Sequence, residues 1–122
     1  MDKVVHFEIP VDDLDRAKKF YSSIFGWELQ DFQFAEGMTY TGVRTVPVDE
    51  KTYMPKEPGA INGGMMQRSK DVHSPIITIN VDSIDEYVKK IKAAGGKAVM
   101  PKGEVPDTVS YTHLTLPTIL LV

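Results

Sequence analysis

The chain has 122 residues, of which 42% are hydrophobic and 25% are charged, and its formal net charge is −3. These values fit one small globular domain, and because the basic residues are not clustered, neither nucleic acid nor an anionic membrane is an expected partner. The lack of cysteine excludes disulfides, thiolate nucleophiles and cysteine-bound metals. With no signal-like start and no apolar run near the roughly 20 residues of a membrane span, we expect a cytoplasmic protein.

Residue periodicity predicts the first two elements. Alternate residues of Val4–Ile9 are apolar, which predicts a half-buried strand with His6 and Glu8 on the same face. A helix follows, because Asp12 and Asp15 form an acidic start before Gly26. Its apolar residues at helical spacing are Ala17, Phe20, Tyr21 and Ile24.

Three further strands are predicted in the first half of the chain. Trp27–Phe34 and Met38–Val46 are separated by a hairpin signal, and Ile61–Gln67 follows a proline-containing loop over 47–60. The first half therefore predicts a βαβββ module that spans residues 3–67.

Part of this module recurs later in the chain. Ile9–Leu29 aligns without gaps with Ile79–Val99, at an offset of 70 residues. The second copy predicts a strand at Pro75–Val81 and a helix capped by Asp82. We therefore expect two like modules related by a pseudo-twofold axis.

The second copy is shorter than the first. It covers residues 73–108 as an incomplete module, because few residues follow Pro106 and Pro117 is one of them. We expect at most one strand in this last part of the chain, ending by Pro117.

The residues of both copies resemble a known superfamily. The run HFEIPVDDLDRAKKFYSSIFGWEL and its echo IITINVDSIDEYVKKIKAAGGKAVMPKGEVP are similar to the vicinal oxygen chelate superfamily, which includes glyoxalase I, extradiol dioxygenases and bleomycin-resistance proteins. The resemblance covers about residues 3–107. It implies an α+β fold in which paired βαβββ modules form an open, barrel-like mixed sheet, here with the second module truncated. It also implies a homodimer.

The tail departs from the superfamily pattern, which would give an aromatic strand and a last strand with an acidic ligand. The chain instead reads TVSYTHLTLPTILLV. From Val109 onward it resembles translated sequencing-adapter sequence, and the alternative is a divergent edge strand, because residues 111–116 alternate in polarity. We expect one domain over 1–108 and a non-native tail over 109–122.

The resemblance implies metal ligands on the first and fourth strands and at their counterparts in the second module. His6 occupies the first position, but Ile76 stands at its counterpart, and Ile61–Gln67 has no carboxylate or imidazole. We therefore predict no metal site and no cofactor; a divalent metal would require ligands from elsewhere. The alternative for His6 is a polar residue hydrogen-bonded to Glu8 or water.

Two features of the strands carry candidate chemistry. His6 and Glu8 form a candidate catalytic acid/base pair, because both side chains project from one strand face, and a solvated strand face is the alternative. Gly63 and Gly64 permit either close approach of a ligand to the backbone or a bulge. No nucleophile motif is present in the sequence.

Aromatic and methionine side chains provide a candidate lining for a ligand cleft. Some of them must instead face the helices as core. The resemblance places these residues around the cleft: Trp27, Phe32, Phe34, Tyr40, Met54, Met65 and Met66. The ligand-binding residues that we predict are Trp27, Phe32, Tyr40, Gly64 and Met66.

The sequence thus predicts a glyoxalase-like protein that binds a small organic molecule in its cleft without a complete metal site. The alternative is a metal-dependent lyase, isomerase or dioxygenase of the lactoylglutathione lyase type, so the question of catalysis stays open. A structural subunit without activity is the third hypothesis.

Overall fold

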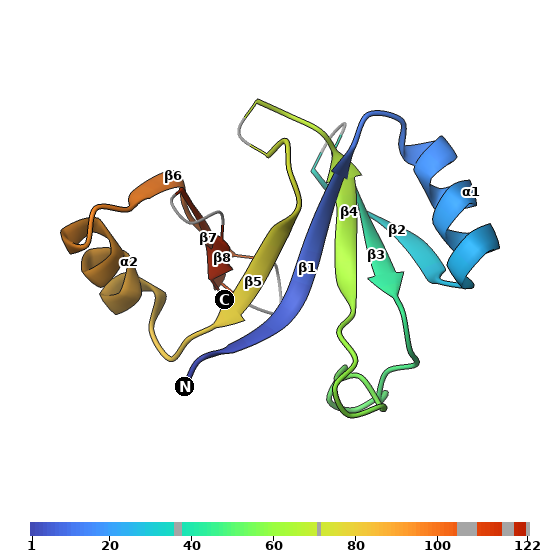
Figure 1. The fold of residues 1–122 in the computed structure, drawn as a ribbon, viewed down its shortest axis with the longest axis horizontal. Coiled ribbons are helices and arrows are strands. Elements are labelled where there is room, and N and C mark those ends of the chain that lie inside the picture. The colour runs from blue at the N-terminus through green and yellow to red at the C-terminus, as the bar shows by residue number, and fades with distance from the viewer. Residues whose placement is uncertain (36–37, 71, 105–109, 116–118, 122) are drawn as a thin grey trace. The chain divides into compact units, whose positions relative to one another are not determined.

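The computed structural model describes residues 1–35, 38–70, 72–104, 110–115 and 119–121. Within these ranges, side-chain surroundings are described for residues 1–33, 39–70 and 72–98. The chain divides into two compact units, one of Met1–Val5 with Ile76–Val122 and one of His6–Pro75. Each unit is built around strands and one helix (Figure 1).

The unit His6–Pro75 has the strand order β2-β3-β4-β1. Its elements are β1 (Lys3–Val11), α1 (Leu14–Phe25), β2 (Glu28–Ala35), β3 (Met38–Arg44) and β4 (Gly63–Gln67), with the first residues of β1 belonging to the other unit. β1 and β4 pair in parallel, and β3 pairs antiparallel with β2 and β4. The predicted βαβββ module is confirmed.

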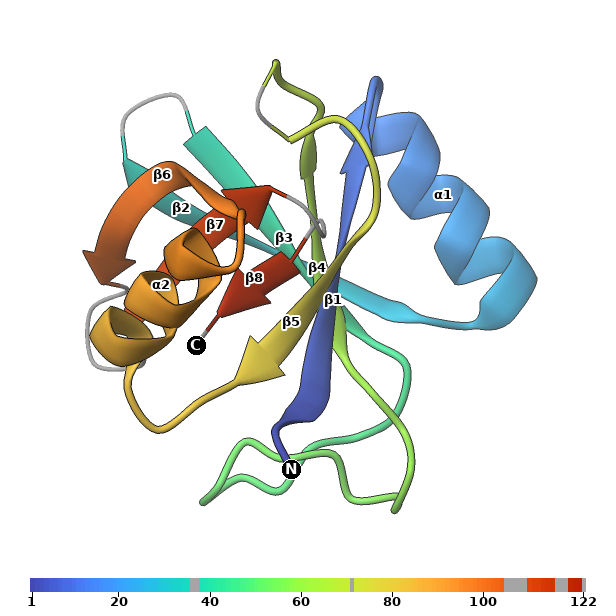
Figure 2. The same cartoon turned by 60° about the vertical axis from the view of Figure 1, so that its left-hand side comes forward.

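The second unit repeats this order as β6-β7-β8-β5. Its elements are β5 (Ile76–Asn80), α2 (Ile84–Ala93), β6 (Lys97–Glu104), β7 (Ser110–Thr115) and β8 (Ile119–Leu121), with α2 beside β6 and β7 (Figure 2). β8 pairs in parallel with β5, as β4 does with β1. Paired βαβββ modules in an α+β fold are therefore confirmed.

The expectation of at most one strand after Pro106 was wrong, because β7 and β8 both form. A free strand edge accepts an extended apolar segment such as Ile119–Leu121 through backbone hydrogen bonds, whatever the preceding residues are. β8 has three residues where β4 has five, so the end of the second module is the shorter. The foreign origin of 109–122 and the boundary at 108 stay predictions.

The two helices begin one residue later than the sequence indicated. Asp13 caps α1 by accepting from the Arg16 amide, and Ser83 caps α2 by accepting from the Glu86 amide. Asp82 is therefore not the cap, because the N-cap side chain accepts from an amide two or three residues after it, and Ser83 is the residue that accepts from Glu86. The caps keep the 70-residue offset. Gly26 ends α1 in the left-handed conformation at φ 70°, as predicted.

α1 is held on the sheet by polar contacts as well as rings, since none of its residues is buried. Lys18 Nζ on α1 donates to Asp31 Oδ2 on β2 at 2.8 Å, and the Thr41 hydroxyl on β3 donates to Asp31 Oδ1 at 2.7 Å. These hydrogen bonds, with Lys18 first, hold the pKa of Asp31 below its usual range. The same ion pair raises the pKa of Lys18.

An aromatic cluster lies between α1 and the start of β2. Tyr21 stacks on Trp27 with centroids 5.0 Å apart, and Phe25 contacts both rings. Phe7 of β1 reaches Trp27 from the sheet. In the other unit, the buried Ile84 of α2 is surrounded by partly buried apolar residues of its own helix and of the neighbouring chain: Ile79, Val81, Tyr87, Val88, Ile91 and Ala98.

We predict that Asp31→Ala lowers the free energy of unfolding by about 2 kcal/mol, because it leaves the fully buried Thr41 hydroxyl without its acceptor. Asp31→Asn keeps that acceptor and loses only the screened ion pair, at most about 1 kcal/mol. Urea unfolding at neutral pH measures both.

The same series has a pH signature. Asp31 contributes stability above its ordinary pKa of 3.8, and this contribution is lost as the pH falls through its lowered folded value. Asp31→Asn should therefore lose less stability than the parent chain between neutral and acidic pH. Equal acid sensitivity of the two proteins would contradict the proposed ion pair.

Candidate functional site

The first module presents one sheet face away from α1, which we call the distal face. Strand register aligns Glu8 with Gly64, Gly64 with Gly42, and Gly42 with Gln30, so these positions share a face across all four strands. Alternation adds His6 on β1, with Tyr40 and Arg44 on β3 and Phe32 on β2. The predicted common face of His6 and Glu8 is confirmed by their contact at 3.3 Å.

A hydrogen-bonded triad of His6, Tyr40 and Glu8 forms on this face. The Tyr40 hydroxyl donates to Glu8 Oε1 at 3.2 Å and lies 2.9 Å from His6 Nε2. Glu8 is only 6% exposed, and its Oε2 has no hydrogen-bond partner among the described residues. Burial, followed by the Glu8 charge, raises the pKa of Tyr40 far above its usual value, so the phenol keeps its proton.

Two glycines make this arrangement sterically feasible. A Cβ on Gly64 would lie 1.7 Å from the Tyr40 hydroxyl, because the Tyr40 ring crosses directly over this position. A Cβ on Gly63 would lie 2.4 Å from the Phe7 carbonyl on the opposite face. The space at the two glycines is therefore occupied by atoms of Tyr40 and Phe7, and a role of the glycines in ligand approach stays a prediction.

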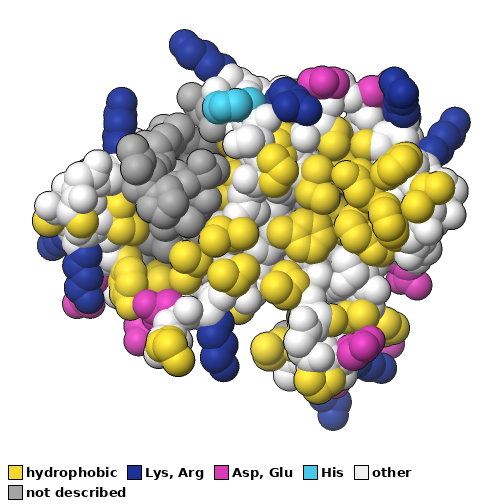
Figure 3. Space-filling view, in the orientation of Figure 1, with side chains coloured by type: hydrophobic (Ala, Val, Ile, Leu, Met, Phe, Trp, Pro, Cys, Tyr) yellow, Lys and Arg dark blue, Asp and Glu magenta, His cyan; other side chains and the backbone are white. Residues whose placement is uncertain are grey.

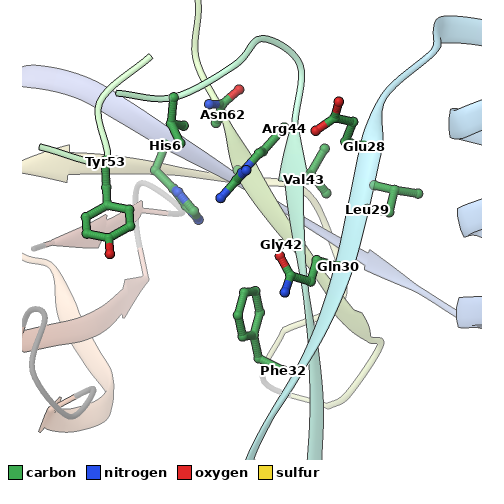
Figure 4. Close-up of a pocket in the computed structure, with 12 residues that line it drawn as sticks. His6, Glu28, Leu29, Gln30, Phe32, Gly42, Val43, Arg44, Tyr53 and Asn62 are labelled. Atoms are coloured by element: carbon green, nitrogen blue, oxygen red, sulfur yellow. The ribbon is translucent and has the colours of Figure 1, made fainter. Parts of the chain in front are cut away.

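A trough of about 420 Å³ lies on the distal face (Figure 4). His6, Arg44 and Phe32 project into it from β1, β3 and β2. The Phe32 ring is 43% exposed and passes 3.0 Å from the place where a Gly42 Cβ would stand. The trough is thus lined by an apolar ring, a cation and an imidazole.

The loop between β3 and β4 forms one wall of the trough. Asn62, at the end of this loop, is hydrogen-bonded to the residues at its start. Its Oδ1 accepts from the amides of Thr45 and Val46, and its Nδ2 donates to the Val46 carbonyl. At the tip, the Asp49 carboxylate accepts backbone hydrogen bonds, chiefly from the Thr52 amide, and these lower its pKa. Tyr53 follows at φ 57°, a left-handed conformation rare outside glycine, and lines the trough.

The predicted ligand-binding residues fall into different places. Phe32 lines the trough, whereas Tyr40 and Gly64 lie beside it on the distal face. Met66 shares the register of Tyr40. Trp27 belongs to the aromatic cluster of α1. Their roles in binding stay predictions.

The remaining cleft candidates are placed as follows. Met65 is fully buried and aligns with Thr41, on the α1 side of the sheet. Met54 is 63% exposed in the loop between β3 and β4. The side chain of Phe34 lies outside the described residues.

Arg44, Tyr53 and Asn62 were not singled out from the sequence. Arg44 had a usable signal, because it continues the alternation of Tyr40 and Gly42 on β3. Tyr53 had none, since its position depends on the turn at Asp49.

The donors on the distal face do not fit the metal-ligand set that the resemblance implies. His6 Nε2 is engaged by Tyr40 and Glu8, and β4 offers Gly64 and Met66 on this face. The counterpart Ile76 is a buried apolar residue at 4% exposure. Among the described side chains there is no group of three or more histidine, aspartate or glutamate residues able to hold a metal ion.

The chain belongs to the Glyoxalase/Bleomycin resistance protein/Dioxygenase superfamily, which matches residues 3–118. Two curated relatives, each described as putative glyoxylase CFP32, come from Mycobacterium bovis and Mycobacterium tuberculosis. Both are 30% identical over 114 aligned positions, and the match covers 91% of this chain. The chain spans about 40% of the length of these relatives.

Solved structures share the fold at low sequence identity. A methylmalonyl-CoA epimerase in complex with methylmalonyl-CoA and NH4+ has a TM-score of 0.66 at 15% identity, covering 99% of this chain and 93% of its own. A hypothetical protein from Bacillus halodurans has a TM-score of 0.63 at 14% identity, covering 98% and 91%. Neither helix in the described part of the chain is long and apolar enough to span a membrane.

We predict that Gly64→Ala destabilises the protein on the order of 3 kcal/mol, because the added methyl group expels the Tyr40 ring from over the strand. Gly42→Ala, its cross-strand neighbour, is the matched control, since its Cβ meets the movable edge of Phe32 at 3.0 Å and the Gln30 carbonyl at an ordinary contact distance of 3.7 Å. We expect a loss below about 1 kcal/mol there. Thermal and urea unfolding compare the two variants. Equal losses would show that Tyr40 does not occupy the space over Gly64.

Proposed function

We propose that this member of the Glyoxalase/Bleomycin resistance protein/Dioxygenase superfamily binds a small organic molecule in the trough of its first βαβββ module, without a complete divalent-metal site. The observation that carries the proposal is the trough itself. Its volume of about 420 Å³ lies within the range typical of small-molecule sites, and it combines apolar with polar side chains.

The side chains of the trough favour a flat molecule with an oxygen anion. Phe32 is 43% exposed and contributes an aromatic ring to the lining of the trough. Arg44 is the cation of the trough, and its guanidinium forms no ion pair with the side chains that the structure describes. A guanidinium binds a carboxylate with two parallel hydrogen bonds. An aromatic carboxylate therefore matches the lining.

We use 2-naphthoate as the probe for this proposal. Titrated into ¹⁵N-labelled protein, it should shift the amide resonances of Phe32, Gly42 and Arg44 more than those of α1. Arg44→Met should weaken binding about tenfold, as expected for loss of a charge-assisted hydrogen bond.

Arg16→Met is the matched control, because Arg16 is an exposed cation on α1 outside the trough. It should leave the affinity unchanged. The proposal is contradicted if both arginine variants weaken 2-naphthoate equally, which indicates nonspecific charge attraction, or if the shifts concentrate on the aromatic cluster of α1.

Metal dependence separates this proposal from the alternative of a metal-dependent lyase, isomerase or dioxygenase. His6 Nε2 is engaged by Tyr40 and Glu8, and Ile76 supplies no ligand. We predict no stoichiometric sub-micromolar binding of Zn²⁺, Ni²⁺, Mn²⁺ or Fe²⁺ to chelator-stripped protein in calorimetry. Tight binding that disappears in His6→Ala would establish the alternative.

We also propose a cytoplasmic homodimer. A chain without cysteine suits a reducing compartment. Hydrophobic side chains gather over β1, β4 and α1 (Figure 3), and Phe20, Ile24 and Phe25 of α1 are each more than half exposed. Burial of such a patch in a twofold interface is favourable.

Light scattering should therefore report twice 13.6 kDa for the chain at micromolar concentration. Phe25→Glu should shift the mass toward that of one chain, because it places a charge in the patch. A single-chain mass for the unmodified protein would refute the dimer.

A further inference from the structure

We infer that Tyr40 and Glu8 are positioning residues that keep the proton of neutral His6 on Nε2, so that His6 presents Nδ1 as a hydrogen-bond acceptor to a ligand in the trough. This inference rests on the proposed function and adds the ligand's chemistry to it. The trough would then favour an aromatic carboxylate that also carries a hydroxyl group.

The single proton of the Tyr40 hydroxyl decides the arrangement. The hydroxyl donates to Glu8 Oε1 at 3.2 Å, and so it has no second proton for the His6 Nε2 that lies 2.9 Å away. The Tyr40 oxygen must accept from His6 there. Nε2 therefore carries a proton, which fixes the tautomer of the neutral ring.

The opposite tautomer is disfavoured by the Glu8 carboxylate. If Nε2 carried no proton, Tyr40 would donate to His6, and Glu8 Oε1 would face lone pairs of both neighbours. Glu8 is almost fully buried, and its Oε2 already has no partner among the described residues. Loss of its remaining hydrogen bond would leave a buried carboxylate unsatisfied, which is costly.

Glu8 also contacts the imidazole directly. Its Oε1 lies 3.3 Å from His6 Nε2, so the N–H can be shared between the phenol oxygen and the carboxylate. A carboxylate that accepts from one imidazole nitrogen orients the ring and leaves the other nitrogen as an acceptor. Within the described part of the chain, the imidazole ring of His6 forms its hydrogen bond through Nε2.

His6 can contact a ligand because its side chain projects into the trough. His6 lines the trough together with Arg44 and Phe32 (Figure 4). A molecule whose carboxylate binds Arg44 and whose ring stacks on Phe32 meets Nδ1 as an acceptor. A hydroxyl group on that ring would satisfy it, whereas a second carboxylate would not.

The tautomer is measured without any ligand. Two-bond ¹H–¹⁵N correlation spectra at about pH 8.5, above the ordinary histidine pKa of about 6.5, report which nitrogen of the neutral ring carries the proton. His6→Asn identifies the His6 signals among the three histidines. We expect the Nε2–H pattern in the parent chain, a partial loss of this pattern in Tyr40→Phe, where Glu8 Oε1 still lies near Nε2, and a mixed pattern in Glu8→Gln.

Tyr87→Phe is the matched control, because it removes a phenol hydrogen bond to Asp2 in the other compact unit. It should leave the His6 pattern unchanged. A predominant Nδ1–H pattern in the parent chain overturns the inference even if no variant folds. An unchanged pattern in a folded Tyr40→Phe protein overturns the role of Tyr40.

A second measurement tests the ligand chemistry. We expect 6-hydroxy-2-naphthoate to bind about fivefold to tenfold more tightly than 2-naphthoate, as one added hydrogen bond allows. Tyr40→Phe should reduce this ratio. Failure of 2-naphthoate itself to bind counts against the proposed function, whereas equal affinities of the two probes count against the inference alone.

Discussion

The buried carboxylate of Glu8 is the constraint on which the site depends. An ionised group with only 6% exposure requires hydrogen bonds from its neighbours, because the protein interior replaces its hydration poorly. Tyr40 and His6 supply them from two different strands. Tyr40 reaches Glu8 only because Gly64, on the strand between, has no side chain. The Glu8 carboxylate thus depends on residues of three neighbouring strands, β1, β4 and β3.

Three glycines of the first module each lie next to an aromatic ring. The Tyr40 ring covers Gly64, the Phe32 ring borders Gly42, and Phe7 covers Gly63 on the face toward α1. Each ring occupies space that a Cβ on the neighbouring glycine would take. α1 is then fastened by the Lys18–Asp31 ion pair rather than by deeply buried residues.

Local patterns in the sequence were sufficient for the modules but not for the triad. Alternation placed His6 and Glu8 on one face, and the 70-residue repeat located both helices and their neighbouring strands. The contact with Tyr40 was missed, because it depends on the register of β1 and β3 against β4, and register is set by long-range pairing. The cap of α2 was missed by one residue, since Asp82 and Ser83 are both good N-cap residues.

The end of the chain shows a different limit of sequence reasoning. Pairing of Ile119–Leu121 with β5 requires only backbone groups and extended conformation, so the lack of superfamily residues there did not exclude a strand. A tail that departs from the superfamily pattern can therefore still take its place in the strand order. The residue types of this segment differ from the superfamily pattern, whereas its backbone pairs with β5 as a strand.

Tyr40 and Glu8 should be energetically coupled across Gly64. A double-mutant cycle with Tyr40→Phe, Glu8→Met and the combined variant, followed by urea unfolding, measures this coupling directly. We expect a coupling free energy between about 1 and 3 kcal/mol, as found for residues in one buried hydrogen-bond network. Additive losses, with coupling below about 0.5 kcal/mol, would contradict it.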